Sequence, residues 1–147
     1  MLKYFTAPIF SIGILITILL FPYRNHLRNQ LREKTKITGE NGIESLEKIN
    51  LGGVEQWILI RGEDKANPVM LFLHGEPGQP YIYRARDIGV DLKLEQHFVM
   101  VYWDQRGQGK SYSSNIPRET MTIEQFVSDI YELTNFLRKN LKFRKYI

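Results

Sequence analysis

Two stretches of this sequence lead from apolar residues into a glycine-rich turn, a pattern that can present backbone N–H groups to a reacting atom. The first is the apolar run 69–73, which continues into His74, Gly75, Glu76, Pro77 and Gly78. Gly75 permits a sharp turn, and Pro77 stiffens the loop so that its N–H groups stay aimed. Such groups stabilise the negative charge that forms on oxygen when an acyl carbon is attacked, typically by about 3–4 kcal/mol per donor.

The second stretch repeats this design. The apolar run 98–103 leads into a polar loop whose candidate residues are Asp104, Gln105, Arg106, Gly107 and Gly109. We interpret this loop as a scaffold: Asp104 and Arg106 are expected to pair and to hold it beside the first loop, and the two glycines permit its tight backbone. Ser111 and the serines that follow it are interpreted as turn residues.

Together and in this order, the motifs H-G-x-P-G and D-Q-R-G-x-G-x-S resemble those of α/β-hydrolases, and most closely the prolyl iminopeptidase-like branch. The resemblance covers residues 45–147, about the first half of such a domain. It implies that the backbone N–H of Glu76 is an oxyanion donor, with His74 and Gly75 shaping the turn. It also implies an enzyme that hydrolyses an amide or ester through an acyl-enzyme, without a metal or another cofactor.

The catalytic residues implied by this resemblance are not in the sequence. The family's nucleophilic serine belongs to a G-x-S-x-G motif, and no such motif occurs in these 147 residues. We expect the nucleophile, the acid and the histidine to lie beyond Ile147, after a strand that starts near Lys145. The chain would then be the N-terminal portion of the hydrolase and inactive by itself. Peptides with a free amino terminus, or other small molecules, are the substrates that the resemblance implies.

Two other interpretations stay open. H-G-E-P also resembles haloalkane dehalogenases, which share an aspartate nucleophile with epoxide hydrolases, although D-Q-R-G-x-G-x-S and Gly78 favour the iminopeptidases. Glu76 departs from the H-G-G-P-G form common in iminopeptidases; its carboxylate would either sit at the mouth of the site or point to solvent. From a different class, the chain could be a non-catalytic membrane-tethered module whose sheet another polypeptide completes.

The elements that position the loops are predicted from the apolar periodicity. Residues 45–51 and 54–61 are expected to form a hairpin, joined by Gly52-Gly53 in a type I′ turn. The runs 69–73 and 98–103 are continuously apolar, as strands covered on both faces are, and residues 82–96 are expected to form the crossover helix between them.

A further helix is predicted to begin at Thr122 with a capping box that includes Gln125. Its inward face is expected to contain Ile123, Phe126, Val127, Ile130, Leu133, Leu137 and Leu141. The pattern predicts an α/β fold: the N-terminal part of an α/β-hydrolase sheet, with an antiparallel leading hairpin and then parallel strands with crossover helices. A sheet that stops at Ile147 would have an exposed apolar edge, so residues 37–147 alone are not expected to fold cooperatively.

The N-terminal segment differs in composition. Residues 5–21 are uncharged and mostly apolar, at the lower limit of the roughly 17–25 residues that cross a bilayer as a helix. We expect an uncleaved transmembrane anchor (1–22), a basic juxtamembrane linker (23–44) and a truncated hydrolase domain (45–147). The apolar run is not followed by an A-x-A-like cleavage site, so a cleaved signal peptide is the weaker alternative. Membrane lipid is then a partner through the N-terminal helix, and the positive-inside rule favours the cytoplasmic side for the globular part.

Composition excludes several other classes. The sequence has no cysteine, which excludes disulfides and thiolate metal sites, and its three histidines are not spaced as zinc ligands. The formal net charge is +4, but no nucleic-acid-binding module accompanies it. We therefore expect neither a metal site nor a nucleic-acid partner.

Overall fold

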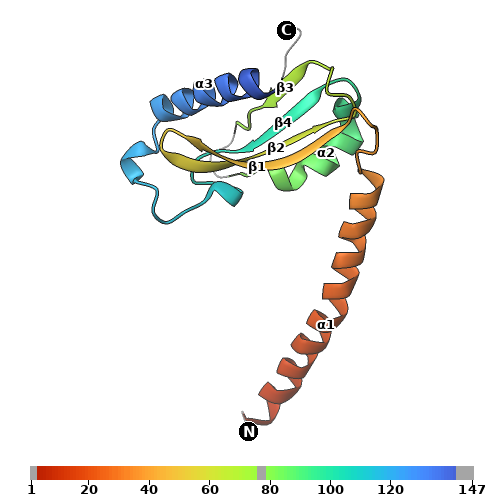
Figure 1. Ribbon diagram of the computed structural model, residues 1–147. Helices are drawn as coiled ribbons and strands as arrows, with labels where there is room; N and C mark the ends of the chain where they lie inside the picture. Colours follow the sequence, from red (N-terminus) through yellow and green to blue (C-terminus); the bar gives the residue numbers. More distant parts are fainter. Residues whose placement is uncertain (1–2, 76–78, 142–147) are drawn as a thin grey trace. The chain divides into compact units, whose positions relative to one another are not determined.

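The computed structural model describes residues 3–75 and 79–141, and the chain divides into two compact units between Lys36 and Ile37. The first unit contains the helix α1 (Lys3–Lys34). The second is an α/β unit in which helices cover both faces of a sheet (Figure 1).

Helix α1 runs without a break through both the apolar run and the basic segment that follows it. The linker predicted over residues 23–44 is helical as far as Lys34. Its arginines and leucines are strong helix formers, and the helix continues even through Pro22. None of the described helices is long and apolar enough to cross a bilayer. The transmembrane helix predicted over residues 1–22 is therefore not found; the apolar run is short for a bilayer and charged residues begin at Arg24.

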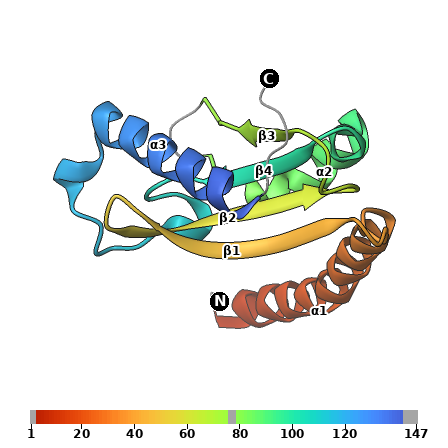
Figure 2. The ribbon, with the colours of Figure 1, turned by 45° about the horizontal axis from the view of Figure 1, so that its top comes forward.

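The α/β unit is built on a four-stranded sheet with the order β1-β2-β4-β3. The hairpin strands β1 (Ile43–Leu51) and β2 (Val54–Gly62) are antiparallel, and β2 pairs antiparallel with β4 (Val99–Asp104). The short strand β3 (Val69–Phe72) pairs parallel with β4. Figure 2 shows β1 at one edge of this sheet and β3 at the other. The predicted mixed α/β sheet with an antiparallel leading hairpin is confirmed.

The hairpin turn follows directly from its two glycines. Gly52 and Gly53 have φ angles of 53° and 77°, a left-handed conformation that side chains other than glycine adopt only with strain. Two such residues in a row define the type I′ turn, whose twist matches that of the flanking strands. Leu51 and Val54 consequently face each other at the end of the ladder, which fixes the register of the hairpin.

Each face of the sheet has its own core. Helix α3 (Ile123–Asn140) covers one face, where the buried side chains are Ile49, Leu51, Ile58, Ile60, Val99, Val101, Trp103, Leu133 and Leu137. Helix α2 (Ala85–Leu92) lies on the other, with Leu59, Ile82, Ala85, Met100 and Tyr102. Alternate residues of β2 and β4 enter opposite cores, as the period of a strand requires. All six residues of β4 are buried, which confirms the prediction of a doubly covered strand for residues 99–103. Phe98 precedes the strand and is half-buried.

Two predictions about burial are wrong. Strand β3 is only half-buried rather than covered on both faces, and Leu73 just after it is exposed, because β3 pairs with β4 alone among the described strands. On α3, Thr122 caps the first turn as predicted, its hydroxyl accepting the N–H of Gln125. Ile123 and Val127 are nevertheless exposed. The apolar contact with the sheet is made by the later turns of this helix.

The predicted crossover helix over residues 82–96 is broken into three pieces. A 3-10 turn at Ile82–Arg84 leads into α2, and a second 3-10 turn spans Leu94–Gln96. Between them Lys93 adopts a left-handed φ of 51°, which ends α2. The strand predicted from Lys145 lies outside the described residues.

Candidate functional site

The two motif loops leave the sheet at the same end. Strands β3 and β4 are parallel, with Phe72 opposite Tyr102, so the loops after Phe72 and after Asp104 both begin at carboxyl ends of strands. In open α/β sheets, ligands bind outside these ends. The predicted juxtaposition of the two loops is thus provided by the sheet itself.

The first loop is described at its start and at its return. Glu76, Pro77 and Gly78, which include the expected oxyanion donor, lie outside the described residues. His74 is buried, and its ring stacks on that of Tyr81 with centroids 5.6 Å apart and an interplanar angle of 7°. Phe72 also contacts Tyr81, at 5.0 Å between ring centroids. Aromatic stacking therefore holds the beginning of the loop against its end.

The carboxylate of Asp104 connects the two loops. Its Oδ1 accepts hydrogen bonds from the backbone N–H groups of Tyr81 at 3.0 Å and Ile82 at 3.1 Å. Its Oδ2 accepts the N–H of Lys110 at 2.9 Å. Asp104 is only 2% exposed, and hydrogen bonds from N–H groups to a buried carboxylate are among the stronger ones in proteins. Asp104 thus fixes the return of the first loop to the glycine loop, as the scaffold interpretation requires.

The predicted pairing of Asp104 with Arg106 is wrong. The fully buried Arg106 pairs with Asp129 of α3, with Nε at 2.9 Å from Oδ2 and Nη2 at 3.0 Å from Oδ1. The same Nη2 donates to the carbonyl oxygens of Leu51 and Gly52 in the hairpin turn. Arg106 therefore fastens the loop to α3 and to the hairpin. Its planar guanidinium satisfies several acceptors at once, which a short link to Asp104 would not achieve.

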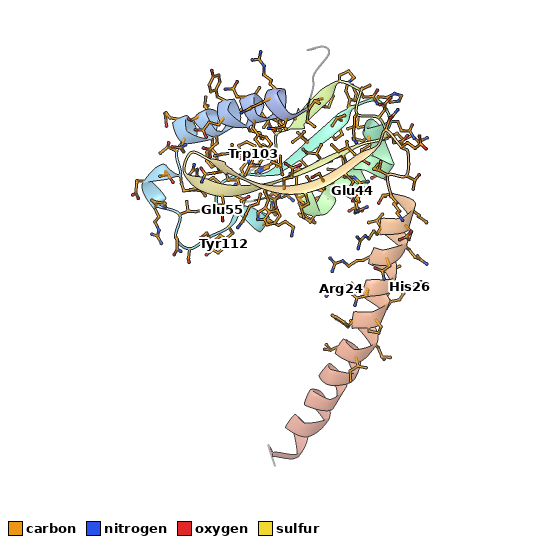
Figure 3. The ribbon with its side chains drawn as sticks, viewed as in Figure 1. Arg24, His26, Glu44, Glu55, Trp103 and Tyr112 are labelled. Carbon is orange, nitrogen blue, oxygen red and sulfur yellow. The ribbon has the colours of Figure 1, made fainter. Side chains whose placement is uncertain are left out.

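Gln56 and Trp103 extend this buried network across the sheet. Gln56 donates to Asp129 Oδ2 at 2.7 Å and accepts the indole N–H of Trp103 at 3.1 Å. Figure 3 shows Trp103 on the side of the sheet that α3 covers. Sequence reasoning missed Asp129, although an acid on the same helix face as Phe126, Ile130 and Leu133 was the signal that could have revealed it.

Close packing explains the glycines of the second loop. Gly109 has a φ of 49°, and a Cβ atom there would lie 2.3 Å from Asp104 Oδ2 and 2.4 Å from Pro80 Cβ. The loop can approach the Asp104 carboxylate only because this side chain is absent. Gly107, at a φ of 76°, is left-handed as well. Gln105, beside them, is half-buried.

Ser111 lies in a 3-10 turn, as its interpretation as a turn residue requires, and it is buried there. It is 2% exposed; its hydroxyl donates to the carbonyl oxygen of Asp104 and accepts the N–H of Trp57 at 2.7 Å. This serine therefore fastens the end of the glycine loop to β2. Its hydroxyl is already used twice in the scaffold, so it is not a nucleophile.

A second buried charge network lies on the α2 face. Arg61 Nε donates to Glu95 Oε1 at 2.7 Å, and its Nη1 lies 2.8 Å from Glu44 Oε1. Burial by itself would lower the pKa of Arg61, but the hydrogen bond and charge of Glu95, together with Glu44, raise that pKa above its ordinary value. Burial raises the pKa of the nearby Tyr102 phenol, and the charge of Glu95 adds to the rise.

This second network ties β1 and β2 to the turn after α2 rather than to the motif loops. Within residues 3–75 and 79–141, no group of three or more His, Asp or Glu side chains is arranged to hold a metal ion.

Comparisons with known proteins agree with the fold. The chain is 41% identical over 101 residues to the probable aminopeptidase YbaC of Bacillus subtilis (strain 168), covering 69% of this chain and 31% of that protein. It also resembles the crystal structure of a proline iminopeptidase-related protein of Thermus thermophilus, with a TM-score of 0.55 and 27% identity over 71% of this chain and 34% of that one. No family model matches.

The comparisons support an α/β-hydrolase fold for this part of the chain. The resemblance to the prolyl iminopeptidase-like branch is confirmed for this part of the fold. The chain spans about a third of the length of the proteins it matches.

Proposed function

We propose that this chain forms the oxyanion-loop portion of a serine-type α/β-hydrolase that cleaves amide or ester bonds, with free-amino-terminal peptides as its substrate class. The observation that carries the proposal is the Asp104 carboxylate, which joins the H-G-x-P loop to the D-Q-R-G loop through three backbone N–H groups. The similarity to two proteins named for aminopeptidase or iminopeptidase function supports the reaction class. The dehalogenase alternative has no such support.

The loop's role in the reaction is to stabilise charge. A nucleophilic serine attacks the acyl carbon, its proton passes to a histidine, and the carbonyl oxygen becomes negatively charged. Backbone N–H groups of the loop after His74, with that of Glu76 proposed from the resemblance, donate hydrogen bonds to this oxygen. Preorganisation matters because donors that need not reorient stabilise the transition state most. Stacking by Tyr81 and the bonds to Asp104 supply that preorganisation at the two ends of the loop.

We further propose that the serine, the acid and the histidine come from a segment other than these 147 residues, since the sequence contains no G-x-S-x-G motif. The edge of β3 is the place for it to join. Among the described strands β3 pairs only with β4, so no described strand uses the N–H and C=O groups of its other edge. A parallel strand added there would end beside the loop at His74 and Gly75.

A chimeric enzyme tests this function. The 101-residue segment of YbaC that matches this chain is replaced by the corresponding residues of this chain, and hydrolysis of amino-acyl p-nitroanilides and p-nitrophenyl esters is compared with that of the parent. We expect kcat/KM within about tenfold of the parent, since the loops keep their geometry. Substitution of the chimera's nucleophilic serine by alanine is the matched control and should abolish activity.

Two results would contradict the proposal. One is a chimera that is as folded as the parent by circular dichroism but hydrolyses neither substrate while the parent does. The other is hydrolysis that survives removal of the serine. The 147-residue chain without a complementing segment is expected to hydrolyse neither substrate.

A further inference from the structure

The net positive charge of this protein equals the net charge of a single helix, α1. Helix α1 contains five basic residues and one acid, Glu33; the basic residues are Lys3, Arg24, Arg28, Arg32 and Lys34. Its formal charge therefore equals the +4 of the whole chain, and the remainder has equal numbers of basic and acidic residues. Ordinary solvation of the α/β unit does not explain why the net charge is confined to α1. The charge points instead to an anionic partner of α1.

Within α1 the three arginines form one stripe. Arg24, Arg28 and Arg32 are spaced four residues apart, which places them in a row along the helix, and all three are exposed. Figure 3 labels Arg24 and His26 on different sides of the helix, in keeping with their spacing of two residues. The guanidinium of Arg24 lies 5.8 Å from the ring centroid of Phe21, one turn earlier. Charge and apolar surface are thus in direct contact.

An apolar stripe runs beside the arginines. It consists of Ile16, Leu20, Tyr23, Leu27 and Leu31, at steps of three and four residues. The first four are 49%, 57%, 60% and 45% exposed, respectively. Before Arg24 the exposed apolar surface is wider than this stripe, because Ile18, Leu19 and Phe21 on the other faces are exposed as well. These side chains continue the apolar run that begins at residue 5. A helix with an exposed apolar stripe flanked by arginines is typical of segments that lie in the plane of a membrane surface.

We propose that α1 binds the surface of a bilayer that contains anionic lipids. The apolar stripe enters the boundary between headgroups and acyl chains, and Arg24, Arg28 and Arg32 contact lipid phosphates and anionic headgroups. Each arginine side chain is long enough to place its stem along the apolar boundary and its guanidinium among the phosphates. The apolar stripe supplies general affinity for the bilayer, and the arginine stripe supplies the preference for anionic lipid.

Vesicle co-sedimentation of the full chain tests this proposal. Vesicles of phosphatidylcholine alone are compared with vesicles in which about a third of the lipid is phosphatidylserine, at low and at high salt. We expect stronger binding to the anionic vesicles, reduced by salt. The triple variant Arg24→Gln, Arg28→Gln, Arg32→Gln should bind them on the order of 100-fold more weakly, about fivefold per arginine. Its residual binding to phosphatidylcholine should equal that of the unmodified chain.

The matched control removes the same charge elsewhere. Lys65, Lys93 and Lys139 are exposed residues of the α/β unit, and their joint replacement by glutamine should leave vesicle binding within about twofold. Circular dichroism checks that each variant keeps its helical content. An equal loss in both triple variants would overturn the proposal, because the protein's overall charge would then be responsible. Equal binding to both kinds of vesicle, or self-association through α1 without vesicle binding, would overturn it as well.

Discussion

At the residue scale, the candidate site depends on the carboxylate of Asp104 and on Gly109, whose lack of a side chain lets the glycine loop pack against that carboxylate. Asp104 is fastened to Tyr81, Ile82 and Lys110, and Gly109 leaves the space for the Asp104 carboxylate. The motif D-Q-R-G-x-G identified both residues from the sequence. The predicted pairing of Asp104 with Arg106 was wrong, because a motif specifies residue types but not the distant elements that their side chains contact. The partner of Arg106 is a residue of α3, and only the packed sheet brings it close.

Replacing Gly109 by alanine tests the close packing. The added Cβ would meet Asp104 Oδ2 at 2.3 Å in a backbone conformation that already disfavours side chains, so we expect a loss of about 2–4 kcal/mol in the free energy of unfolding. Gly53→Ala is the matched control, since it has a φ of 77° but no atom within 4 Å of the added Cβ. It should cost only about 1 kcal/mol. Urea unfolding of the YbaC chimera measures both, and equal losses would refute the packing argument.

The buried phenol of Tyr102 predicts that the free energy of unfolding depends on pH. Its hydroxyl is buried without a hydrogen-bond partner in the described part of the chain, and burial raises the pKa of the phenol. A raised folded-state pKa means that stability is complete below the unfolded pKa of about 10 and is lost as pH rises above it. In the chimera, Tyr102→Phe should raise the free energy of unfolding by about 1 kcal/mol at neutral pH, because an unsatisfied hydroxyl is removed.

The same variant should also reduce the loss of stability above pH of about 10, measured by thermal unfolding across that range. Tyr112→Phe serves as the control, since Tyr112 is exposed and its replacement should change neither quantity. A destabilised Tyr102→Phe variant at neutral pH would show that the hydroxyl is satisfied after all.

At the element scale, local chemistry allowed most boundaries to be predicted. Gly52-Gly53 specified the hairpin turn, the apolar run 98–103 specified β4, and Thr122 specified the start of α3. The break of the crossover helix at Lys93 had no local signal, since lysine is a good helix former. The half-burial of β3 depends on its place at the sheet edge, which its own residues do not specify.

The pair Arg106–Asp129 is expected to dominate the attachment of α3. Both side chains are fully buried, so Asp129→Asn or Arg106→Met leaves one buried charge without its partner and should cost about 3–5 kcal/mol. The double variant Arg106→Met, Asp129→Leu should recover part of that loss. Lys48–Glu55, an exposed pair on the hairpin, is the matched control, and Glu55→Gln should cost less than about 1 kcal/mol. If breaking either pair in the chimera lowered the free energy of unfolding by the same amount, burial would not determine the contribution of an ion pair to stability.

At the scale of the whole molecule, the β3 edge of the sheet is incompletely covered by the described residues. Strand β3 is half-buried and pairs only with β4 among the described strands. Residues 37–147, produced alone, are therefore expected to unfold without a sharp transition and to aggregate through this edge. Differential scanning calorimetry measures this. A single cooperative transition from a monomeric sample would contradict the expectation, as would unchanged behaviour when the same residues are placed in the YbaC chimera.

The central claim is that Asp104 orients the loop that stabilises the oxyanion, and steady-state kinetics of the chimera test it most directly. Asp104→Ala should lower kcat at least about tenfold with KM within about threefold, because the loop return loses two hydrogen bonds and the glycine loop loses one, while substrate contacts remain. Asp104→Asn, which can still accept from Tyr81 and Ile82, should restore part of kcat. Asp64→Ala, which removes a carboxylate from a remote surface turn, should change neither constant. An unchanged kcat in a folded Asp104→Ala chimera would contradict the claim.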